Sequence, residues 1–339
     1  MNPIPSECRR ILLVMSFIGI GTARAESPQA NGAASVQGED AAQAAGGSVD
    51  VPIVLLLHQP DRVLIQIADQ NVAEYVFRDE QILRPYLRHL KTRSGVQVTR
   101  THPPVKGVDL DDHATMHPGL WMAFGDLSGA DFWRNKGRVR HQRFVEVPLG
   151  GKGHGSFTAV NVYESDGRTI CREQCRVQIK VIPSGYLLDW TSIFTPADGE
   201  FAFGDQEEMG LGVRMATLLA VKNGGEITNN DGGTNEAGVW GRQADWCLYG
   251  GTIDGRTVGI ALMPHPDNFR RSWFHARDYG LLVANPFGRQ AFTKGEPSRV
   301  VVKPGEPLTL RFGVLVYAAP TGEPIDIAAV YQSFVGEQP

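Results

Sequence analysis

The chain has 339 residues, of which 42% are hydrophobic and 21% are charged, and its formal net charge is -4 at pH 7. This length allows a large folded core, and the mildly acidic balance without a basic run argues against nucleic acid as a partner. Cysteine is rare, with four residues in the whole chain.

The first 25 residues are typical of a secretory signal peptide. Arg9 and Arg10 precede an apolar run over 11–20, and the small-x-small sequence over 23–25 fits a cleavage site. The run is too short to span a membrane, and no later stretch reaches the roughly 18 apolar residues that a spanning helix needs. We therefore expect an exported protein, periplasmic or secreted, without a transmembrane segment.

Residues 26–50 are rich in Ala, Gly, Gln and Ser and contain no aromatic residue, which predicts a disordered linker. We expect 51–339 to form a single domain. Beyond the signal peptide the cysteines are Cys171, Cys175 and Cys247, an odd number, so at most one intramolecular disulfide forms. The oligomeric state stays open.

From residue 51 onward the dominant hydrophobic period is two, which is typical of strands. The clearest alternation covers 63–67, 95–99, 157–163, 175–181 and 308–312. Tight turns are predicted at Asn230-Asp231-Gly232 and at Ile253-Asp254-Gly255-Arg256. Strands without alternating helices indicate an all-β fold of many antiparallel strands.

One helix is predicted near the end of the chain. Pro324 opens a segment in which Ile327, Val330, Tyr331 and Phe334 share one face, the spacing of a helix that packs on a core. We therefore expect a large antiparallel sandwich or barrel with a short C-terminal helix.

The stretch over 111–121 concentrates residues that carry chemistry. His113 and His117 have the spacing of two ligands on one helical face, but the glutamate of metalloprotease motifs is missing and Pro118 disfavours a helix at His117. We expect the two rings to converge from a loop onto a sugar or a metal, with one of the two preceding aspartates fixing a tautomer. The alternative is a polar loop whose histidines only satisfy backbone groups.

A second polar and aromatic cluster runs over 265–288. Aromatic rings offer flat faces to the C–H surfaces of sugars, while charged and amide groups supply directed hydrogen bonds to hydroxyls. We expect one composite pocket whose substrate-binding residues are Asp112, Trp121, Arg214, His265, Asn268, Trp273, His275, Arg277, Asp278, Tyr279 and Asn285. Alternatively, Trp273 and Tyr279 are core residues and Arg277 pairs with a neighbouring aspartate.

Three carboxylates are candidates for a general base. Glu207 and Glu208 lie in a glycine-rich stretch that we interpret as a strand, so only one of them is expected to reach a pocket while the other is solvated. Glu236 is the third candidate. Burial and a neighbouring charge raise the pKa of such a group toward the range that proton transfer needs.

Three long motifs follow one another in order. They are Asp112-His113-x-x-x-His117-x-Gly119-Leu120-Trp121, Glu207-Glu208-x-Gly210-Leu211-Gly212-Val213-Arg214, and Trp273-x-His275-x-Arg277-Asp278-Tyr279-Gly280. Together they resemble an exported bacterial family labelled PmoA, over about 84–335. The label links the family to a subunit of methane monooxygenase. We do not expect that activity here, because the sequence lacks the spanning segments that such a subunit needs.

The resemblance implies a β-supersandwich of the galactose mutarotase type, whose members bind or transform carbohydrates in a concave groove. By role, His113 or His117 would then be the acid of proton transfer around an anomeric centre. The base would be Glu208 or Glu236. The substrate clamps would be Arg277, Asp278 and Asn285.

The sequence thus predicts an exported carbohydrate-active protein that performs acid–base chemistry on a glycan, a keto-sugar or a free sugar, as a hydrolase, a lyase or an epimerase-like enzyme. One alternative is a carbohydrate-binding protein without turnover. Another is a metal-dependent lyase or hydrolase that holds a divalent ion on His113, His117 and His265. The sequence itself requires no cofactor.

Overall fold

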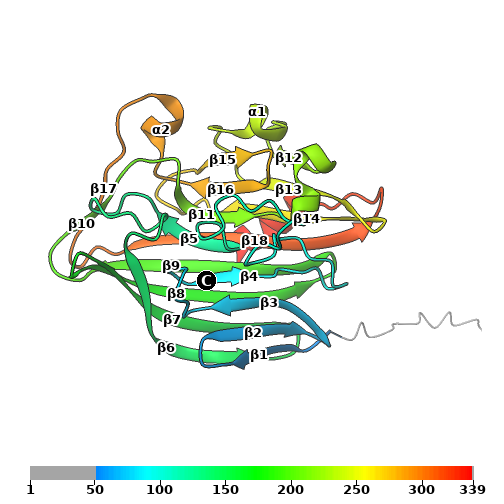
Figure 1. The fold of residues 1–339 in the computed structure, drawn as a ribbon, viewed down its shortest axis with the longest axis horizontal. Helices are drawn as coiled ribbons and strands as arrows, with labels where there is room; N and C mark the ends of the chain where they lie inside the picture. The colour runs from blue at the N-terminus through cyan, green and yellow to red at the C-terminus, as the bar shows by residue number, and fades with distance from the viewer. Residues whose placement is uncertain (1–50, 338–339) are drawn as a thin grey trace, which may run out of the picture. The chain divides into compact units, whose positions relative to one another are not determined.

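The computed structural model describes residues 51–337. Within this part of the chain, two eight-stranded antiparallel sheets form a sandwich, with a small two-stranded sheet beside them (Figure 1). The expected all-β antiparallel fold is confirmed. The predicted signal peptide over 1–25 and linker over 26–50 lie outside the described residues.

The first sheet has the strand order β1-β2-β3-β4-β5-β11-β16-β15. Its strands are β1 (Val54–His58), β2 (Arg62–Ile67), β3 (Gln70–Val76), β4 (Tyr86–Arg88), β5 (Leu120–Phe124), β11 (Met209–Arg214), β16 (Leu281–Asn285) and β15 (Trp273–Arg277).

The second sheet has the order β12-β13-β14-β18-β9-β8-β7-β6. Its strands are β12 (Glu226–Asn229), β13 (Cys247–Ile253), β14 (Arg256–Pro264), β18 (Leu308–Pro320), β9 (Gly185–Pro196), β8 (Arg168–Ile182), β7 (His154–Ser165) and β6 (Arg138–Gly150). The remaining elements are β10 (Phe201–Phe203), β17 (Val300–Val302), α1 (Asn235–Val239), α2 (Arg289–Thr293), α3 (Ile327–Gly336) and the 3-10 turns η1 (Thr217–Leu219) and η2 (Val221–Asn223).

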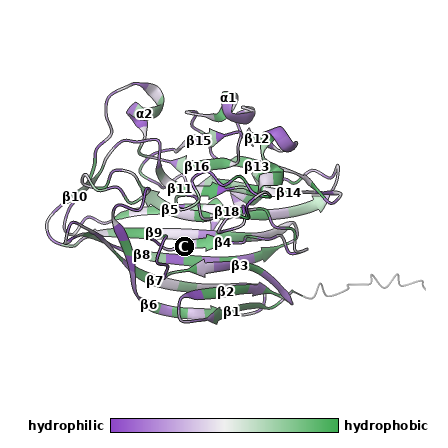
Figure 2. Cartoon of the chain, in the orientation of Figure 1, coloured by the Kyte–Doolittle hydropathy of each residue, from purple (hydrophilic) through white to green (hydrophobic). Residues whose placement is uncertain are grey.

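Alternation along the strands explains why the two sheets pack face to face. On β8 the side chains of Cys171, Cys175 and Val177 are fully buried and Glu173 is buried with them, while Arg172, Gln174 and Arg176 point the other way. Hydrophobic residues follow the strands and are interrupted by hydrophilic ones (Figure 2). The inward side chains of both sheets join in one large core, which includes Leu120 of the first sheet and Val314 of the second.

Two smaller clusters cover the outer faces of the sandwich. On the first sheet, Trp121 and Val283 point away from the main core and lie under loops. On the second sheet, Leu315 points outward and packs against Phe334 of α3. Because successive strand residues face opposite sides, each sheet has an outer surface as well as an inner one, and loops or α3 cover part of that outer surface.

The predicted C-terminal helix is present, but it starts later than expected. Pro324 lies before it, and Asp326 is the N-cap, whose side chain accepts a hydrogen bond from the backbone N–H of Ala329 at 2.9 Å. A carboxylate at this position satisfies a backbone donor that has no partner within the helix. Ile327 and Phe334 are buried as predicted.

The interpretation of 95–99 as a strand is wrong. Gly95 has a φ of +88°, and this segment makes only single bridges, from Gln97 to Lys91 and from Thr99 to Met215. The backbone N–H of Leu90 donates instead to the hydroxyl of Thr99 at 3.0 Å. Backbone bonds from Val98 to Leu90 and from Ala216 to Val98 hold the segment, but they do not extend into a ladder.

Both predicted turns are present, in different settings. Asp254 and Gly255, each with positive φ, join β13 and β14 as a two-residue hairpin turn. The turn at Asn230-Asp231-Gly232 follows β12, but only the single bridge from Thr228 to Thr234 continues it before α1 begins. None of the helices in 51–337 has the length and apolar character to cross a membrane.

Candidate functional site

The motif residues gather on the outer face of the first sheet, where β5, β11, β16 and β15 lie side by side. Gly212 of β11 pairs with Trp121 on one side and with Val283 on the other, so all three point to this face. A Cβ at Gly212 would lie 3.0 Å from the ring of Trp121 and 3.1 Å from that of Trp133. Glycine here lets two indoles pack directly over the strand.

A stack of four rings stands at one end of these strands. The ring of His117 lies parallel to that of Trp121 at 5.1 Å, and the ring of His113 follows at 4.8 Å. Tyr279, just before β16, continues the stack at 6.3 Å from His113. The two histidines therefore converge from a loop, as predicted.

The local backbone produces this arrangement. His113 has a φ of +51°, and its carbonyl accepts the backbone N–H of both Met116 and His117, at 3.0 and 2.9 Å. Pro118 follows and ends the turn before a helix can form. His113 is exposed and His117 is buried, so the two rings have different roles.

Asp112 is fixed by an ion pair with Arg214. The guanidinium donates two hydrogen bonds to the carboxylate, at 2.9 and 2.6 Å, and Arg214 is only 1% exposed. The carboxylate also lies 2.8 Å from Nδ1 of His113. Burial opposes the ionisation of Asp112, but the hydrogen bonds from Arg214 and His113 outweigh it and hold its pKa well below the ordinary range.

His117 is a neutral ring at pH 7. Its burial, together with the nearby charge of Arg214, lowers its pKa well below the ordinary value. Nδ1 of His117 lies 3.4 Å from Nη1 of Arg214, which places an acceptor nitrogen toward the guanidinium. The imidazole of His117 therefore packs in the site as an uncharged ring and does not serve as an imidazolium that donates a proton.

Arg277 of β15 is the centre of a second group. Its Nη1 donates to Glu236 at 2.7 Å and its Nη2 to Glu207 at 3.2 Å. Asp278 and Glu236 exchange hydrogen bonds between side chain and backbone N–H, at 2.8 and 3.2 Å. These bonds hold α1 over the end of β15, and they commit both carboxylates beside Arg277 to protein partners.

His275 lies under this group. Its Nδ1 is 3.3 Å from the carbonyl of Glu207, and its Nε2 is buried and makes no hydrogen bond. Burial, followed by the charge of Arg277, lowers the pKa of His275 to about 4. A neutral ring that donates through Nδ1 supports the loop that carries Glu207.

The interpretation of Glu207 and Glu208 as strand residues is wrong, because β11 begins at Met209. Both side chains therefore reach the outer face: Glu207 meets Arg277, and Glu208 lies 2.9 Å from Nη2 of Arg134. Sequence reasoning did not select Arg134. The sequence did contain a signal for it: Arg134 follows Asp131 by three residues, a spacing that favours an ion pair, and the two side chains lie 3.3 Å apart.

The two groups are neighbours on one surface. Tyr279 is half-buried, and the guanidinium of Arg214 lies 4.5 Å from the centre of its ring. Burial raises the pKa of Tyr279, and the charges of Arg214, Asp112, Arg277 and Glu236 all act on it. Side chains from the two sequence clusters, His113 with Asp112 and Tyr279 with Arg277, therefore lie close together on this face.

Two predicted members of the pocket lie elsewhere. His265 packs against Phe334 of α3 at 5.4 Å, on the outer face of the second sheet. Asn268 bonds both ways with the backbone of Arg311, at 2.9 and 2.8 Å. The expected grouping of these residues with His113 is wrong, because the end of β14 lies on the opposite side of the sandwich.

The trio His113, His117 and His265 does not fit a metal ion for the same reason. Across 51–337, no group of three or more His, Cys, Asp and Glu side chains is arranged to hold one. Asp112, the carboxylate nearest to His113, is already taken by Arg214.

Two other predicted residues serve the fold. Trp273 is 7% exposed and packs against Phe292 of α2. Asn285 is fully buried, and its amide donates to the carbonyls of Gln206 and Glu207 while its oxygen accepts the N–H of Phe287 and Gly288. With its polar atoms satisfied by backbone, Asn285 positions the Glu207 loop and has no group left for a substrate clamp.

Comparison with known proteins gives a family but no activity. No curated protein matches the chain. Among solved structures, the chain is similar to a galactose mutarotase-like protein from Lactobacillus casei ATCC 334, with 10% identity, a TM-score of 0.39, and coverage of 78% of this chain and 100% of that one.

The chain is also similar to a galactose mutarotase related enzyme from Lactobacillus acidophilus, with 9% identity, a TM-score of 0.30, and coverage of 80% and 99%. A profile of a family of unknown function, DUF6807, matches residues 62–332, which include all strands of the first sheet except β1. The chain belongs to the DUF6807 family.

Proposed function

We propose that the protein is a carbohydrate-active enzyme in which His113 is the general acid–base group. The observation that carries the proposal is the contact between Asp112 and Nδ1 of His113, at 2.8 Å, on an exposed ring beside a half-buried aromatic residue. A carboxylate on one ring nitrogen fixes the tautomer and leaves the other nitrogen free to exchange a proton with a substrate.

The chemistry follows from this tautomer. With Nδ1–H donated to Asp112, the lone pair on Nε2 of His113 accepts a proton from a sugar hydroxyl or from a carbon next to a carbonyl. The imidazolium that forms is stabilised by the adjacent carboxylate, and its Nε2–H then returns the proton to the substrate or to a leaving oxygen. Arg214 keeps Asp112 ionised throughout this cycle.

The surroundings support a substrate rich in hydroxyl groups. Tyr279 and Trp240 place aromatic rings beside charged groups: the guanidinium of Arg214 lies 4.5 Å from the ring centre of Tyr279, and that of Arg277 lies 5.7 Å from the ring centre of Trp240. The guanidiniums of Arg134 and Arg277 add hydrogen-bond donors on the same face. Flat aromatic surfaces with directed polar groups are what sugar recognition requires.

A second candidate is a carbohydrate-binding protein without turnover. It is favoured by the ion pairs of Glu208 with Arg134 and of Glu236 with Arg277, which leave neither carboxylate free to serve as a second proton-transfer group. With both carboxylates engaged, an enzyme would have to use His113 as both the acid and the base.

The test is turnover measured by NMR on a panel of neutral sugars, keto-sugars and oligosaccharides, with purified protein and the His113→Asn variant. A matched control is His154→Asn, which removes another exposed histidine at the start of β7. We expect the first change to lower the rate by about 10² to 10⁴ while sugar binding and the fold remain. An unchanged rate in His113→Asn would exclude the role. Binding without turnover in the wild-type protein would select the second candidate.

A further inference from the structure

Apart from the ring stack, a polar hollow lies on the same sheet face, over β2, β3 and β4. It is an open pocket of about 610 Å³ lined by residues that include Arg62, Arg78, Arg88 and His102. Tyr86, whose hydroxyl donates to the pocket residue Asp79, belongs to the same buried cluster as Trp121 of the ring stack. Strand β4 is one strand spacing from β5, which carries Trp121 of the ring stack, and three spacings from β16, which follows Tyr279. Across the strands, the pocket and the ring stack therefore lie roughly 5 to 14 Å apart.

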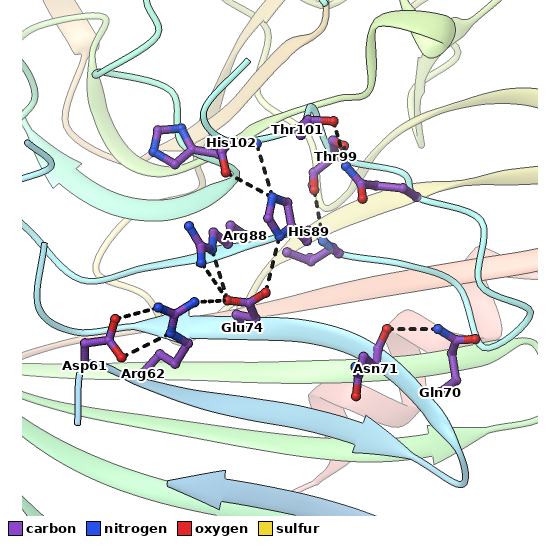
Figure 3. A network of polar contacts seen from close by, with 12 residues as sticks. Asp61, Arg62, Gln70, Asn71, Glu74, Arg88, His89, Thr99, Thr101 and His102 are labelled. Carbon is purple, nitrogen blue, oxygen red and sulfur yellow. Dashed lines mark hydrogen bonds and ion pairs between the residues drawn. The ribbon is translucent and has the colours of Figure 1, made fainter. Parts of the chain in front are cut away.

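Glu74 is the anchor of this pocket (Figure 3). Its Oε2 accepts from Nη1 of Arg62 at 2.9 Å and from Nε and Nη2 of Arg88 at 3.1 and 2.8 Å, and His89 lies 3.4 Å from its Oε1. The hydrogen bond from His89 and those from the two arginines outweigh burial and hold the pKa of Glu74 well below the ordinary range. Two guanidinium planes are thereby fixed before any ligand arrives.

Several N–H groups of these guanidiniums make no hydrogen bond among the described residues. Arg62 makes three hydrogen bonds, two to Asp61 and one to Glu74, so two of its five N–H groups remain. Arg88 makes two, both to Glu74, so three remain. Arg78 uses one to reach the carbonyl of Pro60. The pocket therefore presents N–H donors that have no partner among residues 51–337 and that solvent or a ligand can satisfy.

His102 adds an uncharged polar group to the wall. It is 8% exposed, its ring meets Tyr86 edge-on at 5.4 Å, and its Nδ1 is buried without a hydrogen-bond partner. Burial lowers the pKa of His102 to about 4, so the ring is neutral at pH 7. A neutral imidazole recognises a hydroxyl as donor or acceptor and gives no preference for an anion.

The charges of the wall indicate the class of ligand. Asp61, Asp79 and Glu80 balance the three arginines, and Glu74 below adds one further negative charge. An anion would therefore gain no net attraction. A neutral ligand with several hydroxyl groups can use both the spare donors of the arginines and the acceptors of the exposed Glu80.

We propose that this pocket is a second saccharide site, which binds uncharged sugar residues of the same glycan that reaches His113. The inference rests on the proposed function and deepens it: the substrate is a neutral oligosaccharide, not a single sugar. A chain of several sugar rings is needed to touch both places on the sheet face.

The test compares calorimetric affinities for glucose, cellotetraose, maltotetraose, xylotetraose, mannotetraose and tetragalacturonate. Gln81→Trp places an indole in the pocket from an exposed position whose side chain makes no hydrogen bond among the described residues. The matched control is Gln142→Trp, at an exposed position of β6 in the other sheet. Arg78→Ala removes donors at the rim without touching Glu74.

We expect one of the neutral tetrasaccharides to bind wild type at least about 10-fold more tightly than glucose. Gln81→Trp should abolish that gain, Arg78→Ala should reduce it, and Gln142→Trp should keep it. Wild-type affinity in Gln81→Trp, or tighter binding of tetragalacturonate than of every neutral chain, would overturn the proposal, as would the absence of tetrasaccharide binding to wild type.

The two proposals fail separately. If His113→Asn retains full turnover, the acid–base role is lost, while the comparison of Gln81→Trp with Gln142→Trp still decides the pocket. If His113→Asn stops turnover but Gln81→Trp binds tetrasaccharide normally, the proposed function stands and the second saccharide site is excluded.

Discussion

Asp112 and Arg214 are 102 residues apart in the chain, yet they form a two-bond ion pair at the end of β11. The same carboxylate holds the ring of His113. Buried Arg214 of β11 therefore positions the exposed ring of His113 through the carboxylate of Asp112. Rigid support from a strand is what gives a loop residue a defined position.

The first prediction concerns this ion pair. Asp112→Ala leaves the guanidinium of Arg214 buried without its counter-charge, so we expect the free energy of unfolding to fall by about 3 kcal/mol. Urea unfolding at pH 7 measures it. The control is Asp111→Ala, because Asp111 is exposed and makes no ion pair among the described residues, and it should change stability by less than about 0.5 kcal/mol. Equal stability of the two variants would show that the pair contributes nothing.

The second prediction separates His113 from the carboxylates. Glu208 and Glu236 are each bound to an arginine, so neither is poised to take a proton. We expect Glu208→Gln to lower kcat by less than about 10-fold, against the 10² to 10⁴ expected for His113→Asn. Steady-state kinetics on the substrate found by NMR decides this. A larger loss in Glu208→Gln than in His113→Asn would reassign the base.

The third prediction is a dependence of stability on pH. His141 is buried between Phe77 and Phe144, and burial, followed by the charge of Arg78, lowers its pKa to about 4. The unfolded chain binds a proton at this residue below its ordinary pKa of about 6.5, while the folded chain does not. Stability is therefore present above pH 6.5 and is lost as pH falls toward 4, by about 1.4 kcal/mol per pH unit for one histidine.

His141→Phe should flatten that slope by the contribution of one proton. The remaining slope includes the contributions of His102 and His275, whose pKa values are also lowered to about 4, and of His117, whose pKa is lowered as well. Urea midpoints at half-unit steps between pH 4 and 7 give the two slopes. An identical slope in wild type and His141→Phe would mean that the folded protein binds the proton at His141 as readily as the unfolded chain.

The fourth prediction concerns the cysteines. Cys171, Cys175 and Cys247 are free and buried, and burial raises the pKa of each thiol well above its usual value. We expect no alkylation of these three residues in the native protein and complete alkylation in denaturant, because thiolate and access are both required. Peptide mapping by mass spectrometry assigns each site. Rapid labelling of any of the three without denaturant would contradict the burial.

Some of this could be predicted from the sequence alone. The patterns over 157–163 and 175–181 predicted β7 and β8, because the two-residue period of a strand is visible within a short stretch of sequence. Over 95–99 the same pattern predicted a strand that is absent, because the backbone turns at Gly95 and the segment then makes only single bridges. The loop with His113 was recognised from its composition, and its position on the first sheet was not.

Sequence by itself determined the all-β class and the C-terminal helix, because hydrophobic periodicity is a local property. Only the tertiary structure decided which candidates meet. It placed Arg277 between Glu207 and Glu236 and carried His265 to the opposite face of the sandwich. Those outcomes depend on strand order and register, which join residues far apart in the chain by the packing of whole sheets, and no short stretch of sequence contains that information.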